Sequence, residues 1–175
     1  MKPLKDRAPE GRINPKGIPC LYLAIERDTA LSEVRPWIGS LISVGQFKTS
    51  RNLVLIDCSV KHAEGLIHHL RTREHTTEEK EAGVWAQIDG AFAAPVNPSD
   101  DLAAYVPTQI IGEFFKNDGY DGIVYKSAFG EEGYNVTLFD VDAARLINCF
   151  LYKAKSINIK YEDYGNPYFV TEKKK

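Results

Sequence analysis

The chain has 175 residues, of which 43% are hydrophobic and 26% charged, and its 22 basic and 24 acidic side chains leave a formal net charge of −2. This length suits one domain with one sizeable core, and the composition is that of an ordinary globular protein. The charge balance disfavours direct binding of nucleic acid, and no apolar run approaches the roughly 20 residues that span a bilayer.

The first third of the chain is predicted to contain a turn, a short helix and three strands. Asn14-Pro15-Lys16-Gly17 fits a type I turn, with Asn first, Pro second and Gly fourth. Asp28 is placed to cap a helix over Thr29–Arg35, which Pro36 ends. Three segments have the pattern of strands: Cys20–Ile25, Leu41–Phe47 and Leu53–Cys58.

The middle of the chain is predicted to be helical. The segment from Lys61 to about Phe92 is charged and helix-like, and a loop over Ala94–Asp101 separates it from a helix over Pro107–Asn117 that Gly119 ends. Gln109 and Glu113 lie one turn apart and favour a surface pair. Four apolar side chains of this helix are expected to be buried: Ile110, Ile111, Phe114 and Phe115.

Strands are expected again in the last part of the chain, over Gly122–Ser127, Tyr134–Phe139, Leu146–Tyr152 and Ile157–Tyr161. Strands at both ends around a helical middle predict an α+β fold with mainly antiparallel sheets and flanking helices. We expect one domain over residues 1–175, with a helical insert at about 61–92 and C-terminal strands within 141–172.

Neither a disulfide framework nor a metal site is expected. Cys20, Cys58 and Cys149 lie far apart in apolar runs, which favours buried free thiols. Four histidines share the middle segment: His62, His68, His69 and His75. Adjacent histidines point in different directions on a helix, and no Cys or close Asp completes a site. Because the N-terminus lacks the apolar core of a signal peptide, we expect a cytoplasmic protein that binds no membrane.

The first region that could carry chemistry lies between residues 11 and 36. It holds five polar or aromatic side chains: Arg12, Asn14, Tyr22, Glu33 and Arg35. The turn at Pro15 folds the segment of Arg12 back beside the strand of Tyr22. Glu33 projects from the far end of the short helix, beside its apolar face. On pattern alone, Arg12 and Glu33 could equally form a surface ion pair of little energetic value.

The second region is the strand pair around Ser127. Ile123, Tyr125 and Ser127 share one face of their strand, and Ser127 stands at the strand end, where a polar group can meet a ligand. Gly130 and Gly133 allow the backbone to approach a phosphate or a ribose closely. The alternative is an ordinary hairpin loop with a serine at its mouth.

In order and spacing, the two regions resemble the RES family, named for its Arg, Glu and Ser. The matching stretches are GRINPKGIPCLYLA, TALSEVRP, YVPTQIIGEFF and DGIVYKSAFGEEGYNVTLFD, which form a motif core over residues 11–140. Four residues fall on the family's Arg, Tyr, Glu and Ser: Arg12, Tyr22, Glu33 and Ser127. Asn135 matches the family's Gly-x-Asn-Val region.

The resemblance implies a fold similar to the ADP-ribosyltransferases and NAD as substrate. Many RES proteins are toxins that deplete NAD by phosphorolysis or hydrolysis and pair with an Xre-like antitoxin. The resemblance therefore implies an NAD phosphorylase or glycohydrolase that acts as a toxin or defence effector. It needs no cofactor, although inorganic phosphate is a possible co-substrate, and it can form a homo-oligomer. The alternatives are a protein ADP-ribosyltransferase and a catalytically silent domain that binds a nucleotide or a protein.

Residue roles follow from the same resemblance. Glu33 would stabilise the oxocarbenium-like ribose, and Arg12 would bind the pyrophosphate or ribose as a bidentate fork. Tyr22 would stack on nicotinamide or bind the sugar, and Ser127 would form one hydrogen bond nearby. Asn14, Arg35 and Asn135 are candidate substrate-binding residues. Two features depart from the compact toxins: the chain begins close to the Gly-Arg motif, and the insert at 61–92 is longer.

Overall fold

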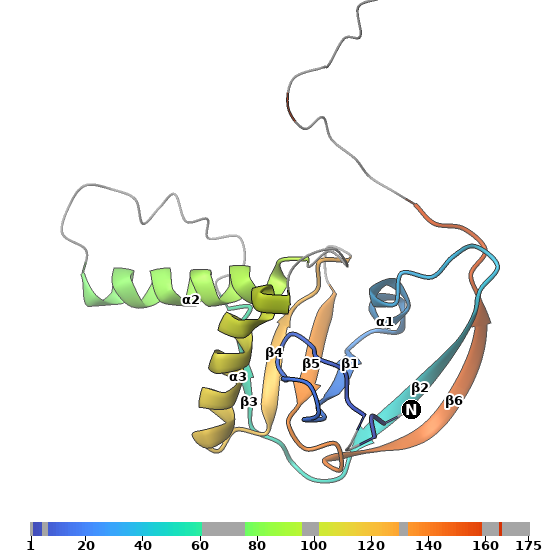
Figure 1. Cartoon of the computed structure of the whole chain (residues 1–175), viewed down its shortest axis with the longest axis horizontal. Coiled ribbons are helices and arrows are strands. Elements are labelled where there is room, and N and C mark those ends of the chain that lie inside the picture. Colours follow the sequence, from blue (N-terminus) through green and yellow to red (C-terminus); the bar gives the residue numbers. More distant parts are fainter. Residues whose placement is uncertain are drawn as a thin grey trace, which may run out of the picture.

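A computed structural model describes residues 2–4, 7–60, 76–95, 102–129, 133–158 and 165 (Figure 1). Its elements in chain order are β1 (Leu21–Ala24), α1 (Arg27–Glu33), β2 (Leu41–Thr49), β3 (Leu55–Asp57), α2 (Thr77–Ala93), the 3-10 helix η2 (Leu102–Tyr105), α3 (Val106–Asn117), β4 (Gly122–Lys126), β5 (Tyr134–Leu138) and β6 (Ala144–Lys153). The predicted α+β class with mainly antiparallel sheets is confirmed.

Two sheets organise the described chain. A central sheet has the strand order β1-β5-β4-β3, and β2 and β6 form a separate two-stranded ribbon. The pairs β1–β5, β4–β5 and β2–β6 are antiparallel, whereas β3 and β4 run parallel. Parallel neighbours need a long crossover, and the helices α2 and α3 lie in the segment that connects these two strands.

The central sheet has a core on each face. One core packs the sheet against the side of α2 and α3, with the buried residues Ile13, Cys58, Phe92, Phe115, Ile123 and Tyr125. The other core contains Leu21, Leu138, Val141, Ala143 and Ala144, with Phe47 of β2 packed against it. The two helices therefore cover one face and the ribbon lies on the other (Figure 1).

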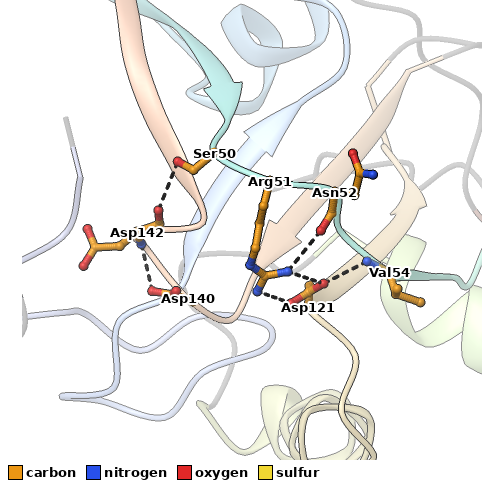
Figure 2. Close-up of polar contacts among 7 residues, drawn as sticks. All are labelled: Ser50, Arg51, Asn52, Val54, Asp121, Asp140 and Asp142. Carbon is orange, nitrogen blue, oxygen red and sulfur yellow. Dashed lines mark hydrogen bonds and ion pairs between the residues drawn. The ribbon is translucent and has the colours of Figure 1, made fainter.

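A polar clamp fixes the segment between the ribbon and β3 to the central sheet (Figure 2). Arg51 donates to both carboxylate oxygens of Asp121, at 2.6 and 3.0 Å, and the Val54 backbone N–H donates to the same carboxylate at 2.8 Å. Ser50 Oγ donates to the carbonyl oxygen of Asp142 just before β6. Because a bidentate pair fixes direction as well as distance, the clamp helps to hold the ribbon against the sheet.

The predicted turn and first helix need correction. The Ile18 N–H donates to the Pro15 carbonyl at 3.2 Å, and Gly17 has a φ of 89°. The turn therefore lies one residue later, with glycine at the third position as in a type II turn. The helix α1 begins at Arg27 without a side-chain cap, and Asp28 lies inside its first turn.

The predicted burial of α3 is half wrong. Ile110 and Phe114 are each 65% exposed. The helix instead buries Thr108, Gly112 and Phe115, which are spaced four and three residues apart and therefore share one face. A side-chain carbon on Gly112 would lie 2.8 Å from Ile13, so the absence of a side chain lets α3 approach the N-terminal loop.

Two further predictions for the last third of the chain are corrected. Cys149 is an exposed thiol, in contrast to the buried Cys20 and Cys58, because β6 belongs to the thin ribbon and most of its residues are exposed. Ile157 and Asn158 are not in a strand, and residues 159–161 lie outside the described part.

The predicted helix in the middle segment is confirmed where it is described. Thr76 and Glu79 form a capping box at the start of α2. Residues 61–75, which include all four histidines, lie outside the described residues, so the expectation of no metal site stays a prediction. The division into one domain with an insert also stays a prediction. Among the described residues, no helix is long and apolar enough to cross a membrane.

Candidate functional site

Strand register gathers polar side chains on one face of the central sheet. Thr137 of β5 is paired with both Tyr22 of β1 and Ile123 of β4, and Asn135 is paired with Tyr125. Paired residues share a face, and residues two apart along a strand share it too. The two tyrosines, the asparagine and the threonine therefore belong to one surface.

Glu33 meets this surface from the end of α1. Its Oε1 accepts a hydrogen bond from Ser127 Oγ at 2.7 Å and another from Asn135 Nδ2 at 2.6 Å. Both donor residues are buried, and Ser127 Oγ also accepts from the Phe129 N–H at 3.0 Å. Glu33, Ser127 and Asn135, which the sequence assigned to one candidate site, are therefore in direct contact, and their roles stay predictions. Among the described residues, only Oε1 of Glu33 accepts hydrogen bonds. These two bonds fix the orientation of the carboxylate and leave Oε2 for a ligand.

Tyr22 is held by the loop that precedes its strand. Its hydroxyl donates to Asn14 Oδ1 at 2.6 Å and accepts from the Ile13 N–H at 3.0 Å. The predicted return of this loop beside β1 is confirmed. Burial raises the pKa of the Tyr22 phenol well above its usual value, so the phenol stays protonated. Asn14 is 2% exposed and its amide donates to the Pro9 carbonyl, so its predicted contact with substrate stays a prediction.

Arg12 faces the carboxyl end of α2. Its Nη1 donates to the Ala91 carbonyl at 2.9 Å and its Nη2 to the Ala94 carbonyl at 2.6 Å. The end of a helix carries partial negative charge, which suits a guanidinium. Since Glu33 bonds elsewhere, the alternative of a surface ion pair between Arg12 and Glu33 is wrong. The predicted role of Arg12 in binding pyrophosphate stays a prediction.

Two residues of α3 hold the same loop, and sequence reasoning predicted neither contact. Thr108 Oγ1 donates to the Arg12 carbonyl at 2.6 Å, and Gln109 Nε2 donates to the Gly11 carbonyl at 3.0 Å. The expected surface pair of Gln109 with Glu113 is not formed, because Gln109 turns toward the loop. The only signal in the sequence was an amide and a hydroxyl next to each other on a helix.

A cavity of about 700 Å³ opens between the central sheet, α1 and the ribbon. Its polar lining includes Glu33, Asn135, Tyr22 and Tyr125, and β2 and β6 add further lining residues, among them the aromatic Phe150. This volume lies in the usual range for small-molecule and cofactor pockets. Sequence reasoning placed Tyr125 on the face of Ser127 but did not include it among the site residues.

Arg35 follows α1 beside this cavity. Its guanidinium lies 5.2 Å from the centre of the Phe129 ring, and its backbone has a φ of 45°. A cation above an aromatic face is electrostatically attracted to it. The structure places Arg35 next to the Ser127 loop, and its predicted contact with substrate stays a prediction.

The arrangement suits a ligand that has both flat rings and sugar or phosphate groups. Tyrosine and phenylalanine offer ring faces, and the oriented carboxylate offers a hydrogen-bond acceptor or a negative charge.

A family model described as RES domain matches residues 1–155. No curated protein and no solved structure matches the chain. The expected likeness to the ADP-ribosyltransferase fold therefore stays a prediction.

Proposed function

The chain belongs to the RES domain family, and we propose that it cleaves the nicotinamide–ribose bond of NAD, with phosphate or water as the acceptor. Family membership supports an NAD-related, toxin-like domain. The observation that carries the finer proposal is the Glu33 carboxylate, held by Ser127 and Asn135 at the wall of the cavity.

Breaking this glycosidic bond leaves positive charge on the ribose. A fixed carboxylate nearby lowers the energy of that oxocarbenium-like state, as in glycoside hydrolysis. Two donors on Oε1 hold the Glu33 carboxylate still, so its other oxygen can face a ribose hydroxyl or the anomeric carbon without reorganising. Nicotinamide then departs as a neutral molecule, and phosphate or water forms the new bond to the ribose.

The other walls fit the rest of a dinucleotide. Tyr22 offers its ring, since its hydroxyl is held by Asn14 and Ile13, and the ribbon adds further aromatic surface. Within the described residues, Arg12 uses two of the five N–H donors of its guanidinium to bind α2. The guanidinium can attract the pyrophosphate to this side of the site.

The test is incubation of the purified chain with NAD, with and without phosphate, followed by separation of the products. Phosphorolysis gives a phosphorylated ADP-ribose, hydrolysis gives ADP-ribose, and transfer labels a protein. Glu33→Gln removes the charge but keeps the shape, and we expect nicotinamide release to fall by about a hundredfold or more. Glu26→Gln is the matched control, because Glu26 lines the same cavity without bonding Ser127 or Asn135. If the Glu33→Gln variant released nicotinamide from NAD as fast as the wild type does, the proposal would be contradicted.

A role as a toxin with an Xre-like antitoxin is part of the proposal. Expression of the wild-type chain in a bacterial host should lower NAD and slow growth, and the Glu33→Gln variant should do neither. Normal growth and normal NAD with the wild-type chain would contradict the toxin role.

A further inference from the structure

Tyr125 is fixed in place at the boundary between core and cavity. It is 6% exposed and sits in the middle of the central sheet, paired with Asn135. Its ring packs against Phe92 of α2, with 5.6 Å between the ring centres and 41° between the planes. The same residue lines the cavity. Because its ring is already packed against Phe92, the position of the Tyr125 side chain is fixed without a ligand. Such a side chain presents a group to a ligand with little loss of rotamer entropy.

The hydroxyl of Tyr125 lies beside a second hydroxyl with unmet hydrogen-bonding capacity. Thr137 is fully buried, and within the described chain its Oγ1 has no hydrogen bond of good geometry. A buried polar atom without a partner costs free energy unless a water or a ligand group completes the bond. Of the two residues only Tyr125 lines the cavity, and Thr137 is buried beside it, so the Tyr125 hydroxyl is the group that can meet a polar group of a ligand.

Two opposite charges act on Tyr125. Burial raises the pKa of its phenol, while the Thr137 hydroxyl and then Arg12 lower it, and Glu33 raises it by a smaller effect. The phenol is thus a neutral donor at physiological pH. Its ring packs on Phe92 of α2, and the neighbouring Ala91 carbonyl binds the Arg12 guanidinium, so the end of α2 brings this cation to the same side of the site as Tyr125. A donor on the side of a cation is suited to an anionic oxygen, because both groups attract the same charge.

We propose that the Tyr125 hydroxyl binds the substrate by donating a hydrogen bond to a phosphate oxygen of the nucleotide, on the Arg12 side of the cavity. This inference rests on the proposed function, since it takes NAD as the ligand. It gives Tyr125 a role in binding the pyrophosphate, separate from the role of Glu33 at the ribose.

The test compares Tyr125→Phe with Tyr120→Phe. Both changes remove one hydroxyl and keep the ring. Tyr120 is a matched control because it packs on Phe115 of the same core, 6.1 Å between ring centres, and does not line the cavity. The first measurement is calorimetric binding of ADP-ribose, which carries the pyrophosphate but cannot release nicotinamide. We expect Tyr125→Phe to weaken the affinity for ADP-ribose about tenfold or more, which is the usual loss for a hydrogen bond to a charged group. Tyr120→Phe should leave this affinity unchanged.

The second measurement is turnover of NAD and of nicotinamide riboside, which has no phosphate. For Tyr125→Phe we expect a raised KM for NAD with kcat near that of the wild type, and unchanged kcat/KM for the riboside. Equal binding of ADP-ribose by variant and wild type would overturn the inference, as would a loss of kcat without a change in KM. A wild-type chain that binds ADP-ribose but never turns over NAD would refute the proposed function, and the calorimetric comparison would still test Tyr125.

Discussion

Gly133 lies where the Ser127 loop approaches α1, and a single added methyl group there should disturb the site. A side-chain carbon at this position would lie 2.7 Å from Thr29 Oγ1, 2.9 Å from the Phe129 carbonyl and 3.0 Å from Thr29 Cγ2. Ordinary contacts between such atoms are about 3.5 Å or more. Thr29 is a buried residue of α1, so Gly133→Ala forces the helix to retreat by roughly 0.5–1 Å.

The size of the effect follows from what the helix carries. Glu33, at the end of α1, bonds Ser127 at 2.7 Å and Asn135 at 2.6 Å. A retreat of this size stretches both bonds toward 3.5 Å, where a hydrogen bond is largely lost. Overpacking and the weakened bonds together should cost about 3 kcal/mol. For a chain of this size the melting temperature then falls by about 6–12 °C.

Urea unfolding followed by circular dichroism, together with nicotinamide release from NAD, measures both consequences. A displacement of about 1 Å at a reacting group can cost about a hundredfold in rate. Gly90→Ala is the control, because nothing lies within 4 Å of its added carbon in α2, and it should gain about 0.5–1 kcal/mol from helix propensity. The double variant Thr29→Ala, Gly133→Ala should recover part of the loss. Unchanged stability and activity in Gly133→Ala would refute the reasoning.

Two further predictions concern the supports of the site. Asn14→Ala removes the acceptor of the Tyr22 hydroxyl and should cost about 1–3 kcal/mol in urea unfolding, because buried polar partners are left unpaired; stability within error of the wild type would contradict this role. Hydrogen bonds from Arg51, then that from the Val54 N–H, lower the pKa of Asp121. Its contribution to stability is therefore present above the carboxyl group's ordinary pKa and is lost as the pH falls through the lowered value. Unfolding measured from pH 7 to acid should show a smaller loss of stability in Asp121→Asn than in wild type, and identical pH profiles would count against the clamp.

Much of the local structure could be predicted because it depends on neighbours in the chain. Alternating apolar residues placed the strands within one or two residues of their observed ends, and Val106–Asn117 formed a helix that ends at Gly119, which has a φ of 91°. The errors came where a local signal competes with tertiary packing. Ile110 and Phe114 look like core residues, but the N-terminal loop packs on the face of Gly112 instead.

Candidate residues for the site could be named from the sequence, but their contacts could not. Motif order alone put Arg12, Tyr22, Glu33 and Ser127 together, and no spacing rule could say that Arg12 binds the end of α2 while Glu33 binds Ser127. Tyr125 is the clearest case. Its alternation with Ser127 was visible, yet its place beside Asn135, on the face that also carries Tyr22, exists only after three strands pair in one register.

The sequence by itself therefore determined the fold class, the element order and the residues of the candidate site, since these follow from periodicity and motif. Only the tertiary structure decided which donors hold Glu33, what Arg12 contacts and where the cavity opens. Hydrogen bonds of this kind join residues that are up to about a hundred positions apart, as Asn135 and Glu33 are, and a contact at that separation is set by the packing of whole elements.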